Sequence, residues 1–155
     1  EYGKSTKFIE LAGEVNTSMP DYVVTRIAEV LNRHGKPIKG TKILIIGLSY
    51  KADVDDCRES PSFVVMDKLS NLGSEISYYD PHIPEIPQTR EHAHWIGLKS
   101  VDWGDEIFRK CDLGVVMTAH KEVNYEQLSQ WAPLILDTRN AMAAINTGST
   151  KIFKA

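Results

Sequence analysis

Lys51 and Arg58 are the residues whose type and position most readily suggest a binding site for an anion. Both lie in the segment at residues 47–61, GLSYKADVDDCRESP, between an apolar run and a predicted helix start. An ammonium group, a guanidinium group and a helix N-terminus can together bind a phosphate or a carboxylate. The spacing alone does not distinguish such an anion-binding site from ordinary ion pairs at the surface. The segment also contains possible acidic partners for both cations: Asp53, Asp55, Asp56 and Glu59.

The segment is not a standard dinucleotide-binding turn. Such a turn needs a second and a third glycine, so that a pyrophosphate can approach the backbone. Ser49 and Ala52 occupy those positions here. A phosphate would therefore be bound through side-chain cations, which argues against a stand-alone NAD-binding Rossmann enzyme.

The flanking elements predict that this segment follows a buried strand. Residues 43–46 are a short, β-branched apolar run, which is typical of a parallel strand. Ser60 and Pro61 are an N-cap and a first-turn proline, and the helix that they start should end near Gly73. A strand predicted at 75–80 completes a βαβ unit, so the segment should lie beyond the carboxyl ends of the strands, where doubly wound sheets bind ligands.

The rest of the chain continues the alternation of strands and helices. Further strands are predicted at 113–117, 134–136 and 152–153, helices at 105–110 and 125–131, and an irregular loop at 81–99. The predicted fold is a three-layer α/β, Rossmann-like domain with a mainly parallel sheet of about five or six strands.

Residues 5–34 have apolar positions at helical spacing, which predicts one long N-terminal helix or two. Pro20 should either kink the helix or open a second one, and Gly35 favours an end just before it. An exposed apolar stripe is an aggregation liability. We therefore expect the following stripe to pack against its own domain or another copy of the chain: Phe8, Leu11, Ala12 and Val15.

Composition narrows the class of protein. The chain has 155 residues and a formal net charge of -3, so a basic surface for nucleic acid is not expected. It contains no apolar run long enough to cross a membrane. Cys57 and Cys111 are not spaced as a disulfide or metal framework, which favours reduced thiols and a cytoplasmic protein. Because the chain starts at Glu1 without a methionine, we expect it to be part of a longer protein.

Several spaced motifs resemble one enzyme family. Residues 47–61, followed by Tyr-Tyr-Asp-Pro at 78–81, resemble the C-terminal domain of the UDP-glucose and UDP-N-acetylhexosamine 6-dehydrogenases. Residues 6–16 are similar to the central helix of that family, nearest to the N-acetylhexosamine branch, and LDTRN at 136–140 is similar to its late D-x-R motif. The resemblance implies a dimerisation-type helix segment over 1–36 and a UDP-sugar-binding domain over 37–155.

The resemblance also implies an activity for the parent protein. NAD would oxidise the C6 alcohol of a UDP-sugar, here a UDP-N-acetylhexosamine, twice to a carboxylate, for polysaccharide biosynthesis and in a homodimer. The NAD-binding domain and the catalytic cysteine would precede Glu1, so no catalytic residue is assigned here and the fragment alone is predicted to be inactive. By their match to family motifs, Tyr50, Lys51 and Arg139 are predicted to contact the UDP-sugar, and Arg58 the NAD.

Other polar residues are given structural roles. Asp80 is predicted to cap the turn before Pro81, because it lies too far along the chain to be the ribose-binding acid of a dinucleotide fold. His92 and His94 are predicted to be surface residues rather than metal ligands, and His120 is predicted to have a structural role in its loop. The tryptophans are predicted to pack in the core or at its edge: Trp95, Trp103 and Trp131.

Two alternatives from other classes of protein stay open at this point. A non-catalytic, nucleotide-binding regulatory module could use the same strand-end segment without a partner domain. A phosphoacceptor receiver domain would need an aspartate poised at a strand end, and Gly47 occupies the end of the first predicted strand.

Overall fold

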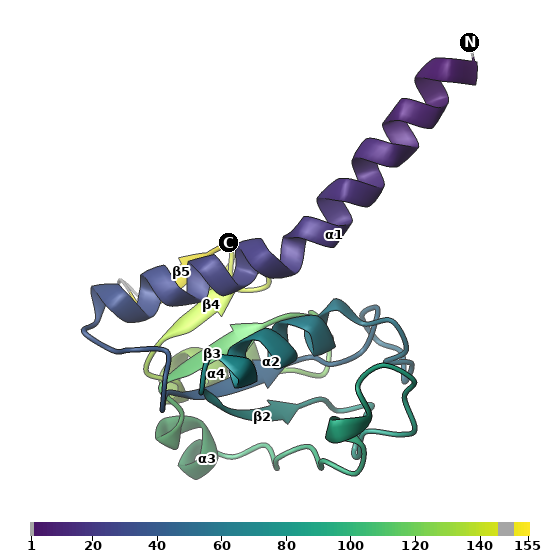
Figure 1. Cartoon of the computed structure of the whole chain (residues 1–155). Coiled ribbons are helices and arrows are strands. Elements are labelled where there is room, and N and C mark those ends of the chain that lie inside the picture. The colour runs from purple at the N-terminus through teal and green to yellow at the C-terminus, as the bar shows by residue number, and fades with distance from the viewer. Residues whose placement is uncertain (1, 146–150) are drawn as a thin grey trace.

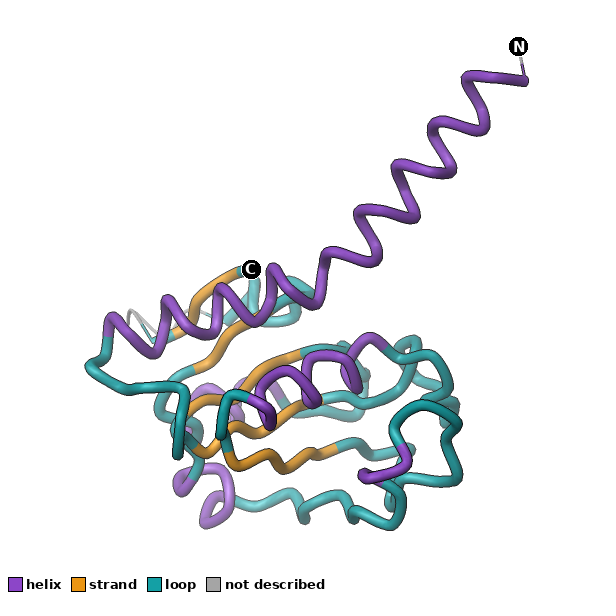
Figure 2. Tube along the Cα trace, viewed as in Figure 1, coloured by secondary structure: helices purple, strands orange, loops and turns teal. Residues whose placement is uncertain are grey.

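The computed structural model describes residues 2–145 and 151–155, with side chains from residue 6 onward (Figure 1, Figure 2). The elements in chain order are α1 (Tyr2–Arg33), β1 (Lys42–Ile46), α2 (Pro61–Asn71), β2 (Glu75–Tyr79), η1 (Ala93–Trp95), α3 (Asp105–Lys110), β3 (Leu113–Val116), α4 (Tyr125–Trp131), β4 (Ile135–Asp137) and β5 (Ile152–Lys154). Each strand and each short helix that the sequence predicts is present.

The strands form one sheet in the order β2-β1-β3-β4-β5. Every pairing between described strands is parallel, which confirms the predicted sheet. The connection through α2 places β2 on one side of β1, and the chain then returns to place β3 on the other side. Ligands of doubly wound folds bind at such a reversal, beyond the carboxyl ends of the two strands.

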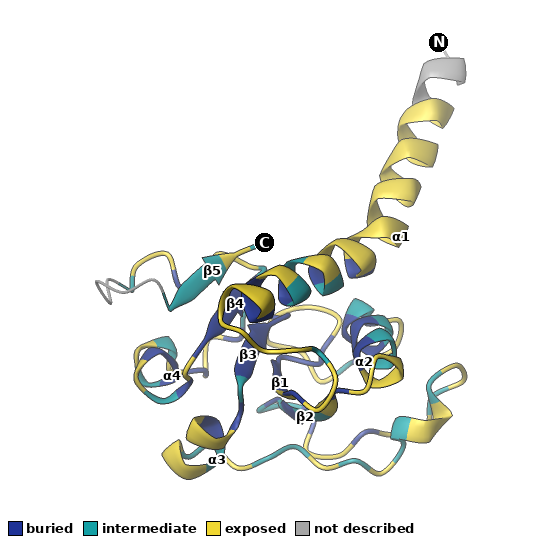
Figure 3. Ribbon diagram, turned by 60° about the vertical axis from the view of Figure 1, so that its left-hand side comes forward, coloured by how far each residue is buried: buried dark blue, intermediate teal, exposed yellow. Residues whose placement is uncertain are grey.

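The sheet is covered on both faces, because successive residues of a strand point to opposite sides. On β1, Ile43 and Ile45 belong to the core under α1 and α2, whereas Leu44 and Ile46 belong to the core under α3 and α4. All four side chains are fully buried. The predicted three-layer α/β architecture is therefore confirmed (Figure 3).

Helix α1 is continuous through Pro20 and changes direction partway along its length (Figure 1). A bend is expected, because proline removes one backbone hydrogen bond of the helix. The second half of α1 contributes four buried residues to the core: Val23, Ile27, Val30 and Leu31. The first half projects away from the sheet, with Phe8, Leu11 and Val15 exposed (Figure 3). The expectation that this stripe packs against its own domain is therefore wrong, and packing against another copy stays a prediction.

The predicted boundary at residue 36 falls between α1 and β1. Because the second half of α1 packs against α2 and the sheet, this half of the helix and the sheet share one core. The division into two domains stays a prediction. Neither α1 nor any other described helix is long and apolar enough to cross a bilayer.

The local signals that begin and end the helices act as expected. The hydroxyl of Ser60 accepts a hydrogen bond from the Ser62 amide, and Pro61 is the first residue of α2. Helix α1 ends at Arg33, and Gly35 follows with a φ of +66°. The irregular connection spans residues 80–104, which is longer than the predicted loop at 81–99, and it is interrupted by η1.

Candidate functional site

The loops after β1 and β3 are joined directly at the reversal of the strand order. Gly47 has a φ of +88°, and its amide donates to the carbonyl of Tyr79 at the end of β2. A Cβ atom on Gly47 would lie 2.6 Å from the Cβ and 2.7 Å from the nitrogen of Thr118. The Thr118 hydroxyl donates to the carbonyl of Ser49 at 2.7 Å. The space beside this glycine is therefore filled by protein.

One buried carboxylate, that of Asp80, organises the same edge of the sheet. Its Oδ2 atom accepts hydrogen bonds from the amides of Leu48 and Ser49, at 2.7 and 3.0 Å, and from the Ser49 hydroxyl at 3.0 Å. The Nε2–H group of His120 donates to the same oxygen at 2.9 Å. Asp80 thus links the loops that follow β1 and β3 from its own position after β2.

The other oxygen of Asp80 makes the turn predicted for this residue. Its Oδ1 atom accepts from the amides of His82 and Ile83, at 2.8 and 3.2 Å, which confirms the capping role. Burial alone raises the pKa of this carboxyl. The hydrogen bonds outweigh burial and lower the pKa from 3.8 to about 2, and they come from His120, His82, Ser49 and Leu48. Asp80 is therefore a buried, charged acceptor.

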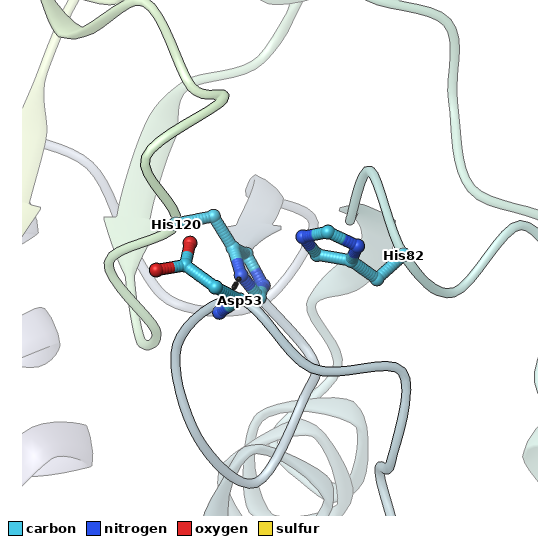
Figure 4. Close-up of side chains that lie close together, drawn as sticks. All are labelled: Asp53, His82 and His120. Atoms are coloured by element: carbon cyan, nitrogen blue, oxygen red, sulfur yellow. Dashed lines mark hydrogen bonds between the residues drawn. The ribbon is translucent and has the colours of Figure 1, made fainter.

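His120 continues this chain of hydrogen bonds into the loop after β1. Its side chain is fully buried, and its Nδ1 atom accepts from the amide of Asp53 at 2.9 Å (Figure 4). The amide of Lys121 donates to the Asp53 carboxylate at 2.8 Å. The structural role predicted for His120 agrees with these contacts.

Asp53, His82 and His120 have potential ligand atoms within 4.8 Å of one another. A metal ion needs a lone pair on each ligating nitrogen. Both ring nitrogens of His120 are already engaged, one as an acceptor from Asp53 and one as a donor to Asp80. In this arrangement His120 has no lone pair to offer a cation.

Tyr50 and Lys51 lie next to this anchored region and are exposed to solvent. The Tyr50 side chain is 48% exposed, and the Lys51 Nζ atom lies 5.6 Å from the centre of its ring. No acidic side chain among the described residues forms an ion pair with Lys51. Lys51 thus lacks the acidic partner that surface pairing would require among the described residues, and its predicted contact with the UDP-sugar stays a prediction.

Arg58 behaves differently. Its Nε and Nη2 atoms donate to the two carboxylate oxygens of Asp56 at 3.0 and 2.8 Å, and its amide donates to the same carboxylate. Its side chain is 82% exposed. Hydrogen bonds from Arg58 lower the pKa of Asp56 from 3.8 to about 2. Arg58 therefore has an acidic partner within its own loop, and its predicted contact with NAD stays a prediction.

Arg139 follows β4 and is positioned by two local contacts. Its amide donates to the Asp137 carboxylate at 2.9 Å, and its Nε atom donates to the carbonyl of Met117 at 2.8 Å. Neither contact uses the Nη atoms, and no carboxylate in the described part of the chain pairs with this guanidinium. At the same edge of the sheet as the loop after β1, the Nη atoms of Arg139 thus have no hydrogen-bond partner among the described residues.

Comparison with known proteins identifies the family. A family model described as "UDP-glucose/GDP-mannose dehydrogenase family, UDP binding domain" matches residues 44–144. The chain belongs to this dehydrogenase family. The UDP-binding-domain match includes the loops after β1, β2, β3 and β4, and so confirms the resemblance seen in the sequence motifs.

Individual members of the family agree with this assignment. The UDP-N-acetyl-D-mannosamine dehydrogenase of Methanococcus maripaludis is 33% identical over 152 residues, which cover 92% of this chain and 32% of the relative. The Campylobacter jejuni protein of the same name is 34% identical over 117 residues, or 75% of this chain and 27% of the relative. This chain thus spans about a third of the length of these relatives or less.

A solved structure of the family has the same fold. The NDP-N-acetyl-D-galactosaminuronic acid dehydrogenase from Methanosarcina mazei Go1 is matched with a TM-score of 0.73 and 26% sequence identity. The match covers 94% of this chain and 30% of the solved chain.

The predicted ligand contacts of this family member all follow carboxyl ends of strands, but they do not touch one another as a cluster. Tyr50 and Lys51 are neighbours, Arg139 lies two strands away, and Arg58 is paired with Asp56. Sequence reasoning missed the hydrogen-bonded chain from Asp80 through His120 to the Asp53 amide. The available signal was that both side chains follow predicted strands, which places them at one edge of a parallel sheet.

The histidines near η1 and the three tryptophans differ in how far they are buried. His92 is only partly exposed, with 16% of its side chain accessible, because it bonds to Asp67 at 2.7 Å and stacks on Phe63. His94 is exposed, as predicted, although it also bonds to Asp67. The tryptophans pack against their neighbours as expected, with Trp95 against the first core and the pair Trp103 and Trp131 against the second.

Proposed function

We propose that the carboxyl edge of this sheet binds the UDP part of a UDP-sugar. In this proposal Lys51 and Arg139 bind the diphosphate, and Tyr50 contacts the nucleotide sugar beside Lys51. The observation that carries the proposal is the pair of cations without acidic partners among the described residues. Phosphate oxygens would supply the missing negative charge, and guanidinium and ammonium groups bind them through charge-assisted hydrogen bonds.

The spacing of the strands supports the same site. Lys51 follows β1 and Arg139 follows β4, with β3 between them. Neighbouring strands lie about 4.8 Å apart, so the two loops begin about 10 Å from each other. The long side chains of lysine and arginine can close this span around a diphosphate. The reversal between β1 and β3 falls inside the span, where ligands of doubly wound sheets bind.

The substrate and the reaction of the parent protein are part of the proposal. Relatives named UDP-N-acetyl-D-mannosamine dehydrogenase favour a UDP-N-acetylhexosamine as the sugar. The parent would oxidise its C6 alcohol to a uronic acid with two hydride transfers to NAD. This chain would supply nucleotide binding and would be inactive alone. A homodimer, a cytoplasmic location and a role in polysaccharide biosynthesis belong to the same proposal.

The residues after β1 do not fit the pyrophosphate of NAD. In a dinucleotide-binding turn the pyrophosphate approaches the backbone at glycine, whereas here Thr118 fills the space beside Gly47. NAD, which would accept the hydrides, is therefore proposed to bind mainly to another domain of the parent chain. Arg58 would contribute from this chain. Arg58 would contact NAD either while its ion pair with Asp56 is kept or after a phosphate of NAD replaces the Asp56 carboxylate.

Titration calorimetry tests the nucleotide site. Lys51→Ala or Arg139→Ala is expected to weaken the binding of UDP by roughly tenfold or more, which corresponds to about 1.5–3 kcal/mol for a hydrogen bond to a charged group. Lys36→Ala is the matched control, because Lys36 pairs with Asp112 at the amino edge of the sheet. This variant should bind UDP as the unaltered chain does.

Two results would contradict the proposed function. One is UDP binding that neither Lys51→Ala nor Arg139→Ala weakens. The other is binding of NAD by this chain without binding of UDP or a UDP-N-acetylhexosamine, which would favour a dinucleotide site in spite of the missing glycines.

A further inference from the structure

The loop that carries Tyr50 and Lys51 has few anchors to the rest of the protein. Residues 50–55 are all exposed. Within the loop, the amide of Tyr50 donates to the carbonyl of Asp56 at 2.7 Å. Asp53 adopts a φ of +62°, a left-handed conformation that costs a non-glycine residue free energy. Contacts with residues outside this loop must therefore stabilise the left-handed conformation of Asp53.

Asp53 receives those outside contacts from the loop after β3. Its amide donates to the Nδ1 atom of His120 at 2.9 Å (Figure 4). Its carboxylate accepts from the amide of Lys121 at 2.8 Å. Only the first contact uses a buried side chain. His120 itself is held by Asp80, which is hydrogen-bonded to the loop after β1 as well.

The positions of the protons on His120 follow from its partners. A backbone amide can only donate, so the Nδ1 atom that faces Asp53 must be the unprotonated acceptor. The ring proton of the neutral tautomer then lies on Nε2 and points at the charged carboxylate of Asp80. The carboxylate thus selects the tautomer that can accept from the Asp53 amide.

We propose that His120 is a positioning residue, which holds the loop at residues 50–56 in the conformation that presents Tyr50 and Lys51 to the nucleotide. Asp80 acts through His120 by fixing its tautomer. This inference rests on the proposed function of Lys51, but the state of the loop can be measured without any ligand.

The surroundings of His120 restrict how it can act. The ring of His82 lies against it edge-on, with ring centres 4.9 Å apart, and the Nε2 atom of His82 is 3.0 Å from the carboxylate of Glu122. Tyr125 donates its hydroxyl proton to the backbone carbonyl of His120 at 3.0 Å. With no exposed ring atom, His120 can influence a ligand only through the loop that it holds.

Two substitutions separate the two hydrogen bonds of the ring. His120→Asn places an amide oxygen near the position of Nδ1, so it keeps an acceptor for the Asp53 amide and loses the donor to Asp80. His120→Gln places its amide nitrogen near the position of Nε2, so it keeps the donor to Asp80 and loses the acceptor. Tyr125→Phe is the control for general loosening, because it removes a contact of the His120 backbone and leaves the ring unchanged.

Three measurements are made on each variant: amide hydrogen exchange at Asp53, the dissociation constant of UDP, and the thermal unfolding midpoint. In His120→Gln we expect exchange at Asp53 to accelerate at least tenfold and UDP to bind about tenfold more weakly. In His120→Asn we expect the larger fall in the unfolding midpoint and the smaller loss of affinity. In the unaltered chain, nitrogen NMR should show a protonated Nε2 and an unprotonated Nδ1 on His120.

The proposal is overturned if His120→Gln leaves exchange at Asp53 unchanged. It is also overturned if affinity falls only in proportion to stability across the three variants, because His120 would then act as an ordinary core residue. If the unaltered chain fails to bind UDP while exchange at Asp53 responds as expected, the proposed function fails and the positioning of the loop by His120 stands.

Discussion

Gly47→Ala is expected to lower the free energy of unfolding by about 3 kcal/mol or more. A left-handed φ costs alanine about 1 kcal/mol, and overpacking against a rigid neighbour costs typically 1–3 kcal/mol in addition. The neighbour is rigid here, because the new Cβ would meet Thr118 at 2.6–2.7 Å in the loop that binds Ser49. For a chain of this size the unfolding midpoint should fall by roughly 10 °C.

Gly40→Ala is the matched control for this prediction. Gly40 has a similar φ of +80°, but nothing lies within 4 Å of the added Cβ. It should lose only the conformational part, about 1 kcal/mol. Equal losses in the two variants would show that the close approach of Thr118 is unimportant. Gly47→Ala should also weaken UDP binding, because the loops after β1 and β3 would be pushed apart.

Asp80→Asn is expected to destabilise the protein by about 3 kcal/mol at neutral pH. The side-chain amide group would bring a donor towards atoms that are themselves donors, and it would remove the charge that they stabilise. The affected donors are the amides of Leu48 and Ser49 and the Nε2–H group of His120. Urea unfolding followed by circular dichroism measures the loss.

The pH dependence of stability tests the same carboxyl group independently. The pKa of Asp80 is lowered in the folded protein from 3.8 to about 2. Its contribution is therefore fully present above about pH 4 and is lost as the pH falls towards 2, and it amounts to about 2 kcal/mol. The unaltered protein should lose this component over that range, and Asp80→Asn should lack it.

Asp112→Asn is the control for removing a strand-end carboxylate. Asp112 bonds to Lys36 and to the amide of Lys42 at the opposite edge of the sheet, and its side chain is 29% exposed. The loss of stability should be smaller there, because water partly replaces the lost contacts. A larger loss in Asp112→Asn than in Asp80→Asn would contradict the central role given to Asp80.

Most of the fold could be predicted because its signals are local. The apolar run at 43–46 is too short for a helix and too apolar for an exposed strand, and Ser60 followed by Pro61 is a strong local signal for a helix start. Pro20 was different, since a proline is compatible with a kink or with a new helix. Only the structure shows that one helix continues through Pro20, with its second half packed in the core beside α2.

The candidate site could be predicted only in part. That Lys51 and Arg139 follow strands was visible in the sequence, and parallel strands bring their carboxyl ends together. Which acid pairs with which cation was not visible, because four acids lie close to both Lys51 and Arg58 in the segment at 47–61. The turn of the backbone selected the pair of Asp56 and Arg58 and left Lys51 without an acidic partner among the described residues.

The sequence by itself determined the class of the fold, the parallel strands and the family, because these depend on local periodicity and on short motifs in a given order. The tertiary structure alone decided how the buried polar groups are satisfied. Asp80 and His120 lie 40 positions apart, and His120 and Asp53 lie 67 positions apart. Their contact depends on β1 lying between β2 and β3 and on the close approach at Gly47, which are properties of strand order and packing that no local pattern encodes.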